Sequence, residues 1–446
     1  MEEIENIKNT SGKIDIQRIR YILSENNGSL MRTWLSICSR CGLCTESCFY
    51  FLAEKDPKLS PAYKIKATLG EMYRLNGNVD YEFLKRCYEI LWFKCTMCKR
   101  CSLFCPFGID IAAMMAIARN VCCSQGVTPK ELAEFTENCR KSGNHMGLPP
   151  EEIVDVCQWL EEEIADELQG VTIPIDKPGV KYMYTINPRE VVFYPKDIAD
   201  AAIIFSIAEE SWTIPSFGWD CTNLPMFAGE RDVAAQAVKN VYDQAIKLGA
   251  EKILITECGH AYRSLAFEGP YMAGYPGGKP PLEIVHYVEL IHEYLVNGII
   301  AIDPAKKFKE PVTYQDPCNV ARNGGFWNEP RKIMEYLADD FRDMVPSCEY
   351  NHCCGGGSGI MPMGPNYKPG RMEAGRIKAK QIEATGAKIV IAPCHNCYDQ
   401  IYDLGEKYNL GIEVFSLKEA LRKMLVIPEK FKPISVSPQF FKRSSA

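Results

Sequence analysis

Residues 351–359, NHCCGGGSG, place two adjacent cysteines directly before three glycines. On a regular helix or strand, adjacent side chains point apart, whereas glycines let the backbone bend until both sulfurs face one centre. Glycines also let backbone N–H groups approach the sulfurs and donate hydrogen bonds to them. The stretch lacks the GxxxxGK[ST] pattern of a phosphate-binding loop, so the cysteines explain its glycines better.

Three more cysteines in this half of the chain accompany the pair. Each of the three segments follows a short apolar run, and open α/β sheets place their sites at the ends of such strands. Five thiolates exceed the needs of one cubane cluster or one tetrahedral zinc ion. They therefore predict an iron–sulfur cluster of unusual shape that leaves room for a sulfur ligand. The five are Cys318, Cys353, Cys354, Cys394 and Cys397.

Two N-terminal runs, CSRCGLCTESC and CTMCKRCSLFCP, share the spacing CxxCxxCxxxC. This is the bacterial-type spacing for two cubane 4Fe–4S clusters, in which the fourth cysteine of each run ligates the other cluster. Structural zinc is the alternative, because CxxC pairs also hold zinc, but two complete runs favour clusters. The first cubane is assigned to Cys38, Cys41, Cys44 and Cys105, and the second to Cys95, Cys98, Cys101 and Cys48.

Composition limits the class of protein. The chain has 446 residues, 46% of them hydrophobic and 24% charged, which predicts two or three globular domains. A net charge of -6 without a long basic run argues against a nucleic-acid partner. The acidic N-terminus does not resemble a secretory signal, and no apolar run is long enough to span a bilayer. With 21 cysteines, the expectation is a cytoplasmic protein whose clustered thiols bind metal.

The expected fold is α+β and multidomain, with a helical two-cluster ferredoxin domain followed by two α/β lobes. Apolar runs such as AAIIFSIA (201–208) and KIVIAP (388–393) alternate with helical patterns and predict parallel strands. The expected divisions are an N-terminal arm with one short helix (1–29), the ferredoxin domain (30–170), a Pro/Gly-punctuated linker (171–196), a degenerate lobe (197–300), a complete lobe (301–430) and a tail (431–446).

A weak internal repeat relates the two lobes: AIKLGAEKILITECGHAYR is similar in layout to QIEATGAKIVIAPCHNCYD. The first lobe keeps Cys221 and Cys258, but Asp220 and Ala261 stand where the second lobe has cysteines. Two thiols cannot hold a five-thiolate cluster, so only the second lobe is expected to carry one. The two remaining thiols are either a redox pair or relics of a lost site.

With these motifs the chain resembles the CCG-domain iron–sulfur subunits of the heterodisulfide reductase D (HdrD) type, which include DsrK and the related Hmc and Tmc subunits. The resemblance covers about residues 30 to 425 and implies that the five cysteines of the second lobe hold a non-cubane 4Fe–4S cluster. The single complete lobe fits DsrK-like members better than a full heterodisulfide reductase. The GxGxxG fingerprint is absent, so no flavin or nicotinamide is expected.

The resemblance also implies a function and partners. Electrons would pass from quinol or haem through both cubanes to the third cluster, which would reduce a disulfide or trisulfide. The expected partners are a membrane haem b/quinone subunit, other subunits of a respiratory complex and a sulfur-carrier protein of the DsrC type with C-terminal cysteines. The chain would lie on the inner face of the cell membrane. The alternatives are an electron relay without its own substrate and a subunit of a glycerol-3-phosphate or glycolate dehydrogenase.

Several residues beside the cysteines are further candidates. His395, between the two cysteines of the last CxxC pair, is a candidate proton donor to a leaving thiolate. His260 and His352 also adjoin motif cysteines, and a packing role is expected for both. Arg263 and Arg322 could bind an anion, but a solvated surface position is the favoured prediction.

Overall fold

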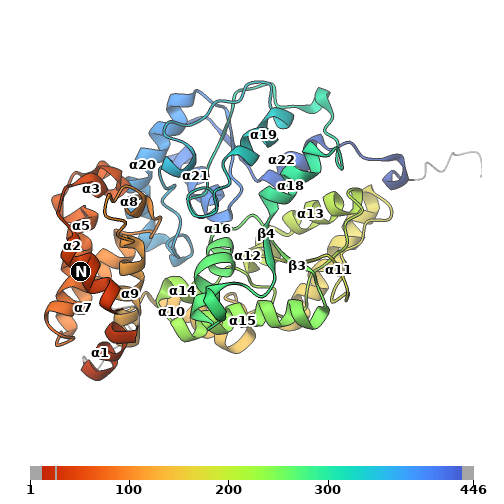
Figure 1. Ribbon diagram of the computed structural model, residues 1–446. Coiled ribbons are helices and arrows are strands. Elements are labelled where there is room, and N and C mark those ends of the chain that lie inside the picture. Colours follow the sequence, from red (N-terminus) through yellow and green to blue (C-terminus); the bar gives the residue numbers. More distant parts are fainter. Residues whose placement is uncertain (1–12, 26–27, 434–446) are drawn as a thin grey trace, which may run out of the picture.

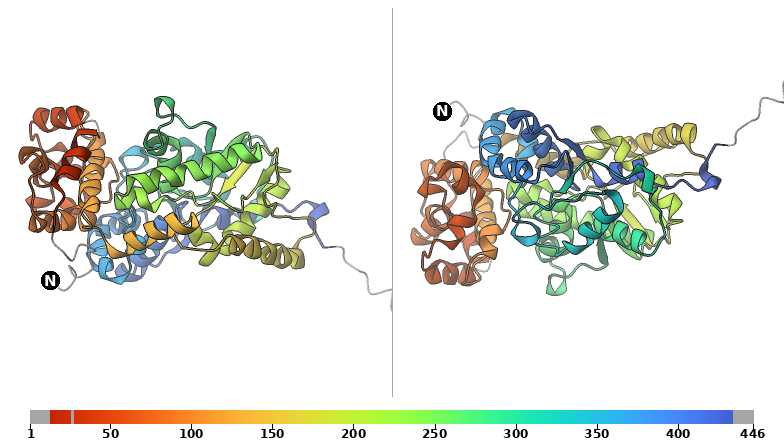
Figure 2. Two further views of the ribbon diagram at one scale, coloured as in Figure 1. Left: turned by 90° about the horizontal axis from the view of Figure 1, so that it is seen from below. Right: turned by 90° about the horizontal axis from the view of Figure 1, so that it is seen from above.

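The computed structural model describes residues 13–25 and 28–433. A helical block stands beside a larger α/β body in all three views (Figure 1, Figure 2). Residues 1–12 of the expected arm and 434–446 of the expected tail lie outside the described residues. The arrangement is the expected α+β multidomain fold.

The helical block carries both N-terminal cysteine runs. Its first helix, α1, was expected within a separate arm, but Ile19, Ile22 and Leu23 are buried against α9, so it belongs to the block. The helices are α1 (Ile16–Glu25), α2 (Gly28–Ile37), α3 (Leu43–Ser47), α4 (Phe49–Glu54), α5 (Pro61–Ile65), α6 (Glu71–Arg74), α7 (Tyr81–Tyr88), α8 (Arg100–Leu103) and α9 (Ile111–Ser124).

The next two helices, α10 (Lys130–Ser142) and α11 (Pro150–Glu167), leave this block. They were assigned to the ferredoxin domain over 30–170, but they pack against the α/β body, as Figure 1 shows. The reason lies in α11, whose apolar stripe, including Cys157 and Leu160, enters the main core of the body. An apolar face packs on whichever surface can bury it, and the sequence of the helix does not specify that surface.

The first lobe is a four-stranded parallel sheet in the order β2–β1–β3–β4. Its second strand in that order, β1, falls inside 171–196, the stretch expected to be a linker. All four of its residues are buried. The linker prediction was wrong because the prolines and glycines on either side of the strand are typical of a loop. The strands are β1 (Tyr182–Thr185), β2 (Trp212–Thr213), β3 (Lys252–Ile255) and β4 (Glu283–His286).

The helices of the first lobe include one that was predicted as a strand. The run 201–208 lies almost entirely in α13, which is buried on most of its surface and so lacks the amphipathic pattern that marks a surface helix. The helices are α12 (Pro188–Val192), α13 (Pro195–Ile207), α14 (Leu224–Ala228), α15 (Arg231–Leu248), α16 (Gly259–Tyr262), α17 (Gly269–Met272) and α18 (Tyr287–Val296).

The second lobe is a three-stranded parallel sheet in the order β5–β6–β7, and β6 lies in the run 388–393 predicted as a strand. One apolar core extends through both lobes. Within the described ranges, no helix is both long and apolar enough to cross a bilayer. The elements are β5 (Val312–Tyr314), β6 (Ile389–Ile391), β7 (Glu413–Phe415), α19 (Asn328–Leu337), α20 (Lys368–Thr385), α21 (His395–Tyr408) and α22 (Leu417–Met424).

Candidate iron–sulfur sites

The four cysteines assigned to the first cubane line one cavity in the helical block. Cys41 is exposed, and Cys38, Cys44 and Cys105 are half-buried. Burial raises the pKa of the Cys44 thiol, and the neighbouring thiols of Cys38 and Cys105 add to that shift. The tight turn between α2 and α3 depends on Gly42, whose φ of 88° suits glycine. The structure thus brings this set together beside the protein surface.

The set assigned to the second cubane lines a neighbouring cavity. Lys64, which is 3% exposed, points its ammonium at this set and lies 3.6 Å from the Cys48 sulfur. The same ammonium donates a hydrogen bond to the backbone carbonyl of Lys94. The set is Cys48, Cys95, Cys98 and Cys101. Crosswise sharing of the fourth cysteine is therefore compatible with the fold, because α3, α4 and α8 bring the two runs together.

The five cysteines of the second lobe form one continuous chain of sulfur contacts. Cys353 contacts both Cys318 and Cys354, and Cys397 contacts both Cys354 and Cys394. Contact with its neighbours holds the pKa of Cys354 well below its usual range, and contact with Cys397 lowers the pKa of Cys394 to about 7. Cysteines that bind metal must be deprotonated, and a positive centre shared by these sulfurs would stabilise their thiolate forms.

The glycines after the cysteine pair allow this geometry. The N–H of Gly355 lies 3.4 Å from the Cys353 sulfur, and the N–H of Gly356 lies 3.4 Å from the Cys354 sulfur. Gly355 has a φ of 104°, and a Cβ on Gly356 would lie 2.6 Å from the carbonyl oxygen of Asn396. The two positions therefore require glycine for different reasons, one for its backbone angle and one for its close packing.

The second cubane set directly adjoins the five-cysteine site. The thiols of Cys98 and Cys353 are within hydrogen-bond range of each other, although they belong to different domains. The hydroxyl of Thr96 lies 3.5 Å from the Cys353 sulfur. The three sites therefore follow one another in space. The set that contains Cys41 lies at one end, the second four-cysteine set lies in the middle, and the five-cysteine site lies at the other end.

Two arginines, the buried Arg119 and the half-buried Arg322, hold the junction between these domains. Arg119 donates hydrogen bonds to the carbonyl of Cys95 in the helical block, to that of Phe227 in the first lobe and to Ser358 in the glycine-rich loop. Arg322 donates to the carbonyls of Cys98 and Asn351, among others. Each guanidinium thereby ties the loop of the second cubane to the loop of the cysteine pair.

The prediction of a solvated surface position for Arg263 and Arg322 is wrong. Arg322 is half-buried and bonded to backbone carbonyls, while Arg263 is 1% exposed, pairs with Glu268 and donates to the carbonyl of Met97. The sequence cannot distinguish these positions, because an arginine that binds distant carbonyls has no local signature.

Two buried polar groups fit an anionic, sulfur-rich group at these sites. Lys378 is fully buried on α20, and its recorded hydrogen bond is to the sulfur of Met344 at 3.5 Å. Burial lowers the pKa of Lys378 to about 8, opposed by nearby Asp316 and by thiols of the site. The Tyr50 hydroxyl is buried beside Cys353 with no hydrogen-bond partner among the described residues. Buried charges and hydroxyls are normally paired, and thiolates with cluster sulfide would pair both.

The three histidines beside the site differ in their capacity to hold a proton. Burial lowers the pKa of His260 and of His352 to about 3, so both are neutral at pH 7. His260 Nε2 accepts a hydrogen bond from the Ser358 N–H at 2.9 Å, which is the expected packing role. Burial opposes charge on His395 too, but its 2.8 Å hydrogen bond to Asp197 raises the pKa above its usual value. Of the three, His395 is best placed to carry a proton.

The remaining thiols of the first lobe do not form a comparable set. The Cys221 thiol donates a hydrogen bond to the carbonyl of Ile186 at 3.2 Å, and burial raises its pKa well above the usual range. Asp220 accepts from the backbone and ring nitrogens of His145. Cys258 is buried, and Gly259 directly after it contacts Cys394 of the second lobe. These thiols are protonated core groups at the junction between the lobes.

Comparisons with known proteins agree with the arrangement of sites. Residues 34–109 match the family described as a 4Fe-4S dicluster domain, and residues 312–402 match the CCG family, described as a cysteine-rich domain. These two matches indicate 4Fe–4S clusters in this chain. They cover the helical block and the second lobe, where the two groups of cysteines lie.

Three relatives extend the similarity across most of the chain. An Hdr-like menaquinol oxidoreductase iron–sulfur subunit of Archaeoglobus profundus is 25% identical over 89% of this chain and 80% of its own length. The corresponding subunit 2 of Archaeoglobus fulgidus is 24% identical over 93% and 83%. The D-type component of the dihydromethanophenazine:CoB–CoM heterodisulfide reductase of Methanosarcina mazei is 22% identical over 89% and 95%. The order of motifs, the two matched families and these relatives together make the chain similar to the CCG-domain iron–sulfur oxidoreductase subunits of the heterodisulfide reductase D type.

Proposed function

We propose that this chain is the iron–sulfur subunit of a membrane-associated respiratory complex and that it reduces a disulfide or trisulfide bond at the five-cysteine site of the second lobe. Cys38, Cys41, Cys44 and Cys105 would hold the cubane at which electrons enter. Cys48, Cys95, Cys98 and Cys101 would hold a second cubane that relays them. The five cysteines would hold a non-cubane 4Fe–4S cluster as the final centre.

The contact between Cys98 and Cys353 is the observation that carries this proposal. It leaves no intervening residue between the ligands of the second cubane and those of the third cluster. Arg119 and Arg322 fix that distance from both sides. The exposed Cys41 supports entry at the other end, because an external donor can approach that site most closely.

The proposed reaction converts R–S–S–R, two electrons and two protons into two R–SH molecules. The third cluster, when bound, supplies a centre that accepts electrons one at a time and accommodates sulfur. Lys378 provides a fixed positive charge beside the substrate sulfur, and His395 holds a proton that Asp197 stabilises. His395 delivers that proton to the sulfur that leaves, so no charged thiolate has to depart alone.

The partners follow from the relatives' names and from the resemblance. Two relatives are named as menaquinol oxidoreductase subunits, which supports a quinol as the electron source here and a membrane haem b/quinone subunit as the donor. The proposed location is the inner face of the cell membrane. The proposed acceptor is a DsrC-type sulfur carrier in dissimilatory sulfur metabolism.

A second candidate is an electron relay that performs no substrate chemistry of its own. A relative from Syntrophomonas wolfei, 22% identical over 88% of this chain and 58% of its own length, is named an EtfAB:quinone oxidoreductase. That name contains no sulfur substrate and so favours a relay. The two candidates differ in whether the isolated chain reduces a sulfur–sulfur bond.

The deciding experiment is anaerobic assay of the iron-loaded protein with reduced viologen as donor and an organic disulfide or trisulfide as acceptor. Thiol release that disappears in Cys353→Ser supports the reductase. The matched control is Cys348→Ser, since Cys348 lies five residues away, is half-buried and has its recorded side-chain hydrogen bond to Ser347 rather than to a cysteine of the site. Rapid oxidation of the clusters by a quinone analogue, without any thiol release from any sulfur compound, would instead support the relay.

A further inference from the structure

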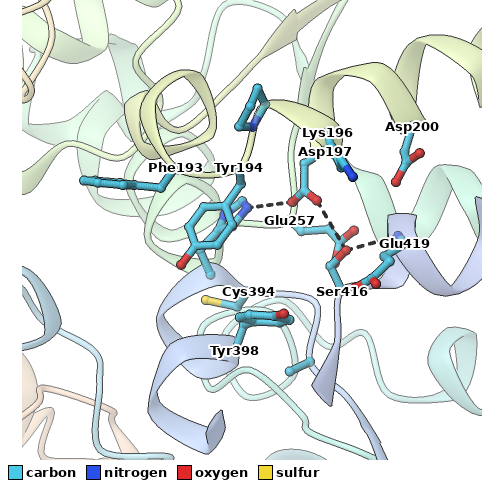
Figure 3. A pocket seen from close by; sticks show the side chains of 13 residues that line it. Phe193, Tyr194, Lys196, Asp197, Asp200, Glu257, Cys394, Tyr398, Ser416 and Glu419 are labelled. Atoms are coloured by element: carbon cyan, nitrogen blue, oxygen red, sulfur yellow. Dashed lines mark hydrogen bonds and ion pairs between the residues drawn. The ribbon is translucent and has the colours of Figure 1, made fainter. Parts of the chain in front are cut away.

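A cavity of about 350 Å³ lies between the two lobes, within the range of small-molecule sites (Figure 3). One wall comes from the first lobe, where residues 193–200 enter α13. The other comes from the second lobe, from residues after β6 and β7. The cavity exists only because the lobes meet, so neither lobe could form it alone.

The cavity reaches the five-cysteine site. Cys394, one of the five, lines its wall (Figure 3). His395 lines it too and is 4% exposed. Its Nε2 is bonded to Asp197, while its Nδ1 is buried without a hydrogen-bond partner among the described residues. A molecule in the cavity would therefore meet both a sulfur of the site and an unpaired ring nitrogen.

Aromatic side chains form the mouth of the cavity. Phe193 is 59% exposed, an unusual position for a phenylalanine. The Tyr194 ring stacks on the His395 ring at 5.3 Å and meets Tyr398 edge-on at 6.1 Å. Asp399 accepts hydrogen bonds from the Tyr194 hydroxyl and from Arg189, which fixes the stack. Such faces contact alkyl groups and attract cations.

The polar lining of the cavity is mainly acidic. Its carboxylates are Asp197, Asp200, Glu257 and Glu419, and its exposed cation is Lys196. The other nearby cations already have carboxylate partners: Lys418 pairs with Glu190 and Asp197, Arg422 with Asp200 and Glu167, and Lys423 with Glu419. Burial, reinforced by the charge of Asp197, raises the pKa of Asp200 to about 7.

We propose that this cavity receives the sulfur-bearing arm of the substrate and prefers an uncharged or amine-bearing arm to one that ends in a carboxylate or sulfonate. An anionic arm would face four carboxylates in the walls and, among the described residues, a single unpaired lysine, Lys196, which is exposed to solvent. A cationic arm would lie between the aromatic faces and the carboxylates of Asp200 and Glu419. The inference depends on the proposed function, because it assigns the substrate class of that same site.

The test uses three thiols with the same two-carbon arm: cysteamine, 2-mercaptoethanol and 3-mercaptopropionate. Each is titrated anaerobically into the iron-loaded protein, and binding is followed by the EPR signal of the third cluster and by calorimetry. The half-saturating concentration is expected to be lowest for cysteamine and highest for 3-mercaptopropionate. The half-saturating concentrations of cysteamine and 3-mercaptopropionate are expected to differ by about tenfold.

The three thiols also differ in their own acidity, which affects binding equally in every protein variant. Variants of the cavity therefore show how much of the preference comes from the cavity. Asp200→Asn combined with Glu419→Gln is expected to narrow the cysteamine preference by roughly threefold or more. The matched control, Glu406→Gln, removes an exposed carboxylate from α21, the helix that begins at His395, and is expected to leave the preference unchanged.

Two outcomes would overturn the inference, and they can be told apart. If all three thiols change the third signal but the double variant keeps the wild-type preference, the cavity does not select the substrate and the proposed function stands. If none of the thiols changes that signal or binds by calorimetry, the sulfur chemistry itself is wrong and the cavity assignment falls with it.

Discussion

The ends of β3 and β6 occupy equivalent positions in the two lobes but carry different chemistry. In the second lobe, β6 leads to Cys394 and to a chain of five contacting thiols beside Lys378. In the first lobe, β3 leads to Cys258, and the buried charges nearby form ion pairs instead. Lys418, from α22, donates to Glu190 and to Thr256 there.

The difference concerns how each region satisfies a buried ammonium. Lys418 finds a carboxylate 2.8 Å away, whereas the recorded hydrogen bond of Lys378 is to a methionine sulfur. Buried charge is tolerated only when it is paired. The charges at the end of β3 are therefore satisfied by side chains of the protein, including Lys418 from the second lobe, while the end of β6 is arranged around a partner that the cysteines would hold.

The largest expected effect is the loss of a whole cluster. Three clusters of four irons predict about twelve irons per chain, and Cys353→Ser should reduce this to about eight. The equivalent change in the first lobe, Cys258→Ser, should leave about twelve. Iron analysis with EPR of anaerobic protein measures both. An iron loss of the same size in Cys258→Ser would end the distinction between the lobes.

Removing the paired lysine should cost stability. Lys418→Met leaves Glu190 buried without its partner and should lower the free energy of unfolding by about 3–5 kcal/mol. Adding Glu190→Gln should restore part of it, since the uncompensated charge is then gone. Anaerobic urea unfolding measures the change. Lys423→Met on the same helix removes an exposed pair and should cost less than about 1 kcal/mol.

The glycine loop offers a narrower test in the second lobe. Gly356→Ala places a Cβ against the Asn396 carbonyl and should destabilise the protein by about 1–3 kcal/mol while lowering occupancy of the third cluster. At Gly357 the nearest atom to an added Cβ is 3.7 Å away, so Gly357→Ala should have little effect. Equal behaviour of the two variants in iron content and unfolding would contradict the packing argument.

Replacing Lys378 should change the midpoint potential of the third cluster more than the iron content. Lys378→Met removes a positive charge beside the five thiols and should lower the midpoint potential of the third cluster by roughly 60 mV, the one-electron equivalent of a tenfold change in equilibrium. EPR-monitored redox titration measures the shift. Lys380→Met, exposed on the same helix, serves as control. Unchanged potentials would mean that Lys378 has only a structural role.

The smallest effect concerns pH in the first lobe. Burial lowers the pKa of His286, at the end of β4, to about 3 from 6.5. Its unfolded form takes up a proton below pH 6.5 while the folded form does not, so stability falls as the pH drops through that window, by up to about 1.4 kcal/mol per pH unit. His286→Asn keeps an acceptor for the Val288 N–H and should make the dependence shallower. The same pH dependence of the unfolding free energy in the wild type and in His286→Asn, measured anaerobically, would contradict this.

The sequence predicted the grouping of the cysteines more fully than the fold. It predicted which cysteines would be brought together, because metal ligation is encoded in residue type and in short spacings such as CxxC. It also predicted strands where apolar runs are short, as at 388–393. It was wrong about 171–196 and 201–208, where β1 is bordered by prolines and α13 is buried on most sides. In those stretches, burial by distant elements overrides the local pattern.

The sequence by itself determined which cysteines are candidate ligands, how they are grouped and which known proteins the chain resembles, since these depend on residues close together along the chain. Only the tertiary structure decided that the second set of four cysteines touches the five-cysteine site, that Arg119 and Arg322 hold that junction, and that a cavity beside Cys394 has an acidic, aromatic lining. These features join segments that lie far apart in the sequence. Their chemistry arises from burial and charge pairing across packed surfaces, which no local pattern of residues records.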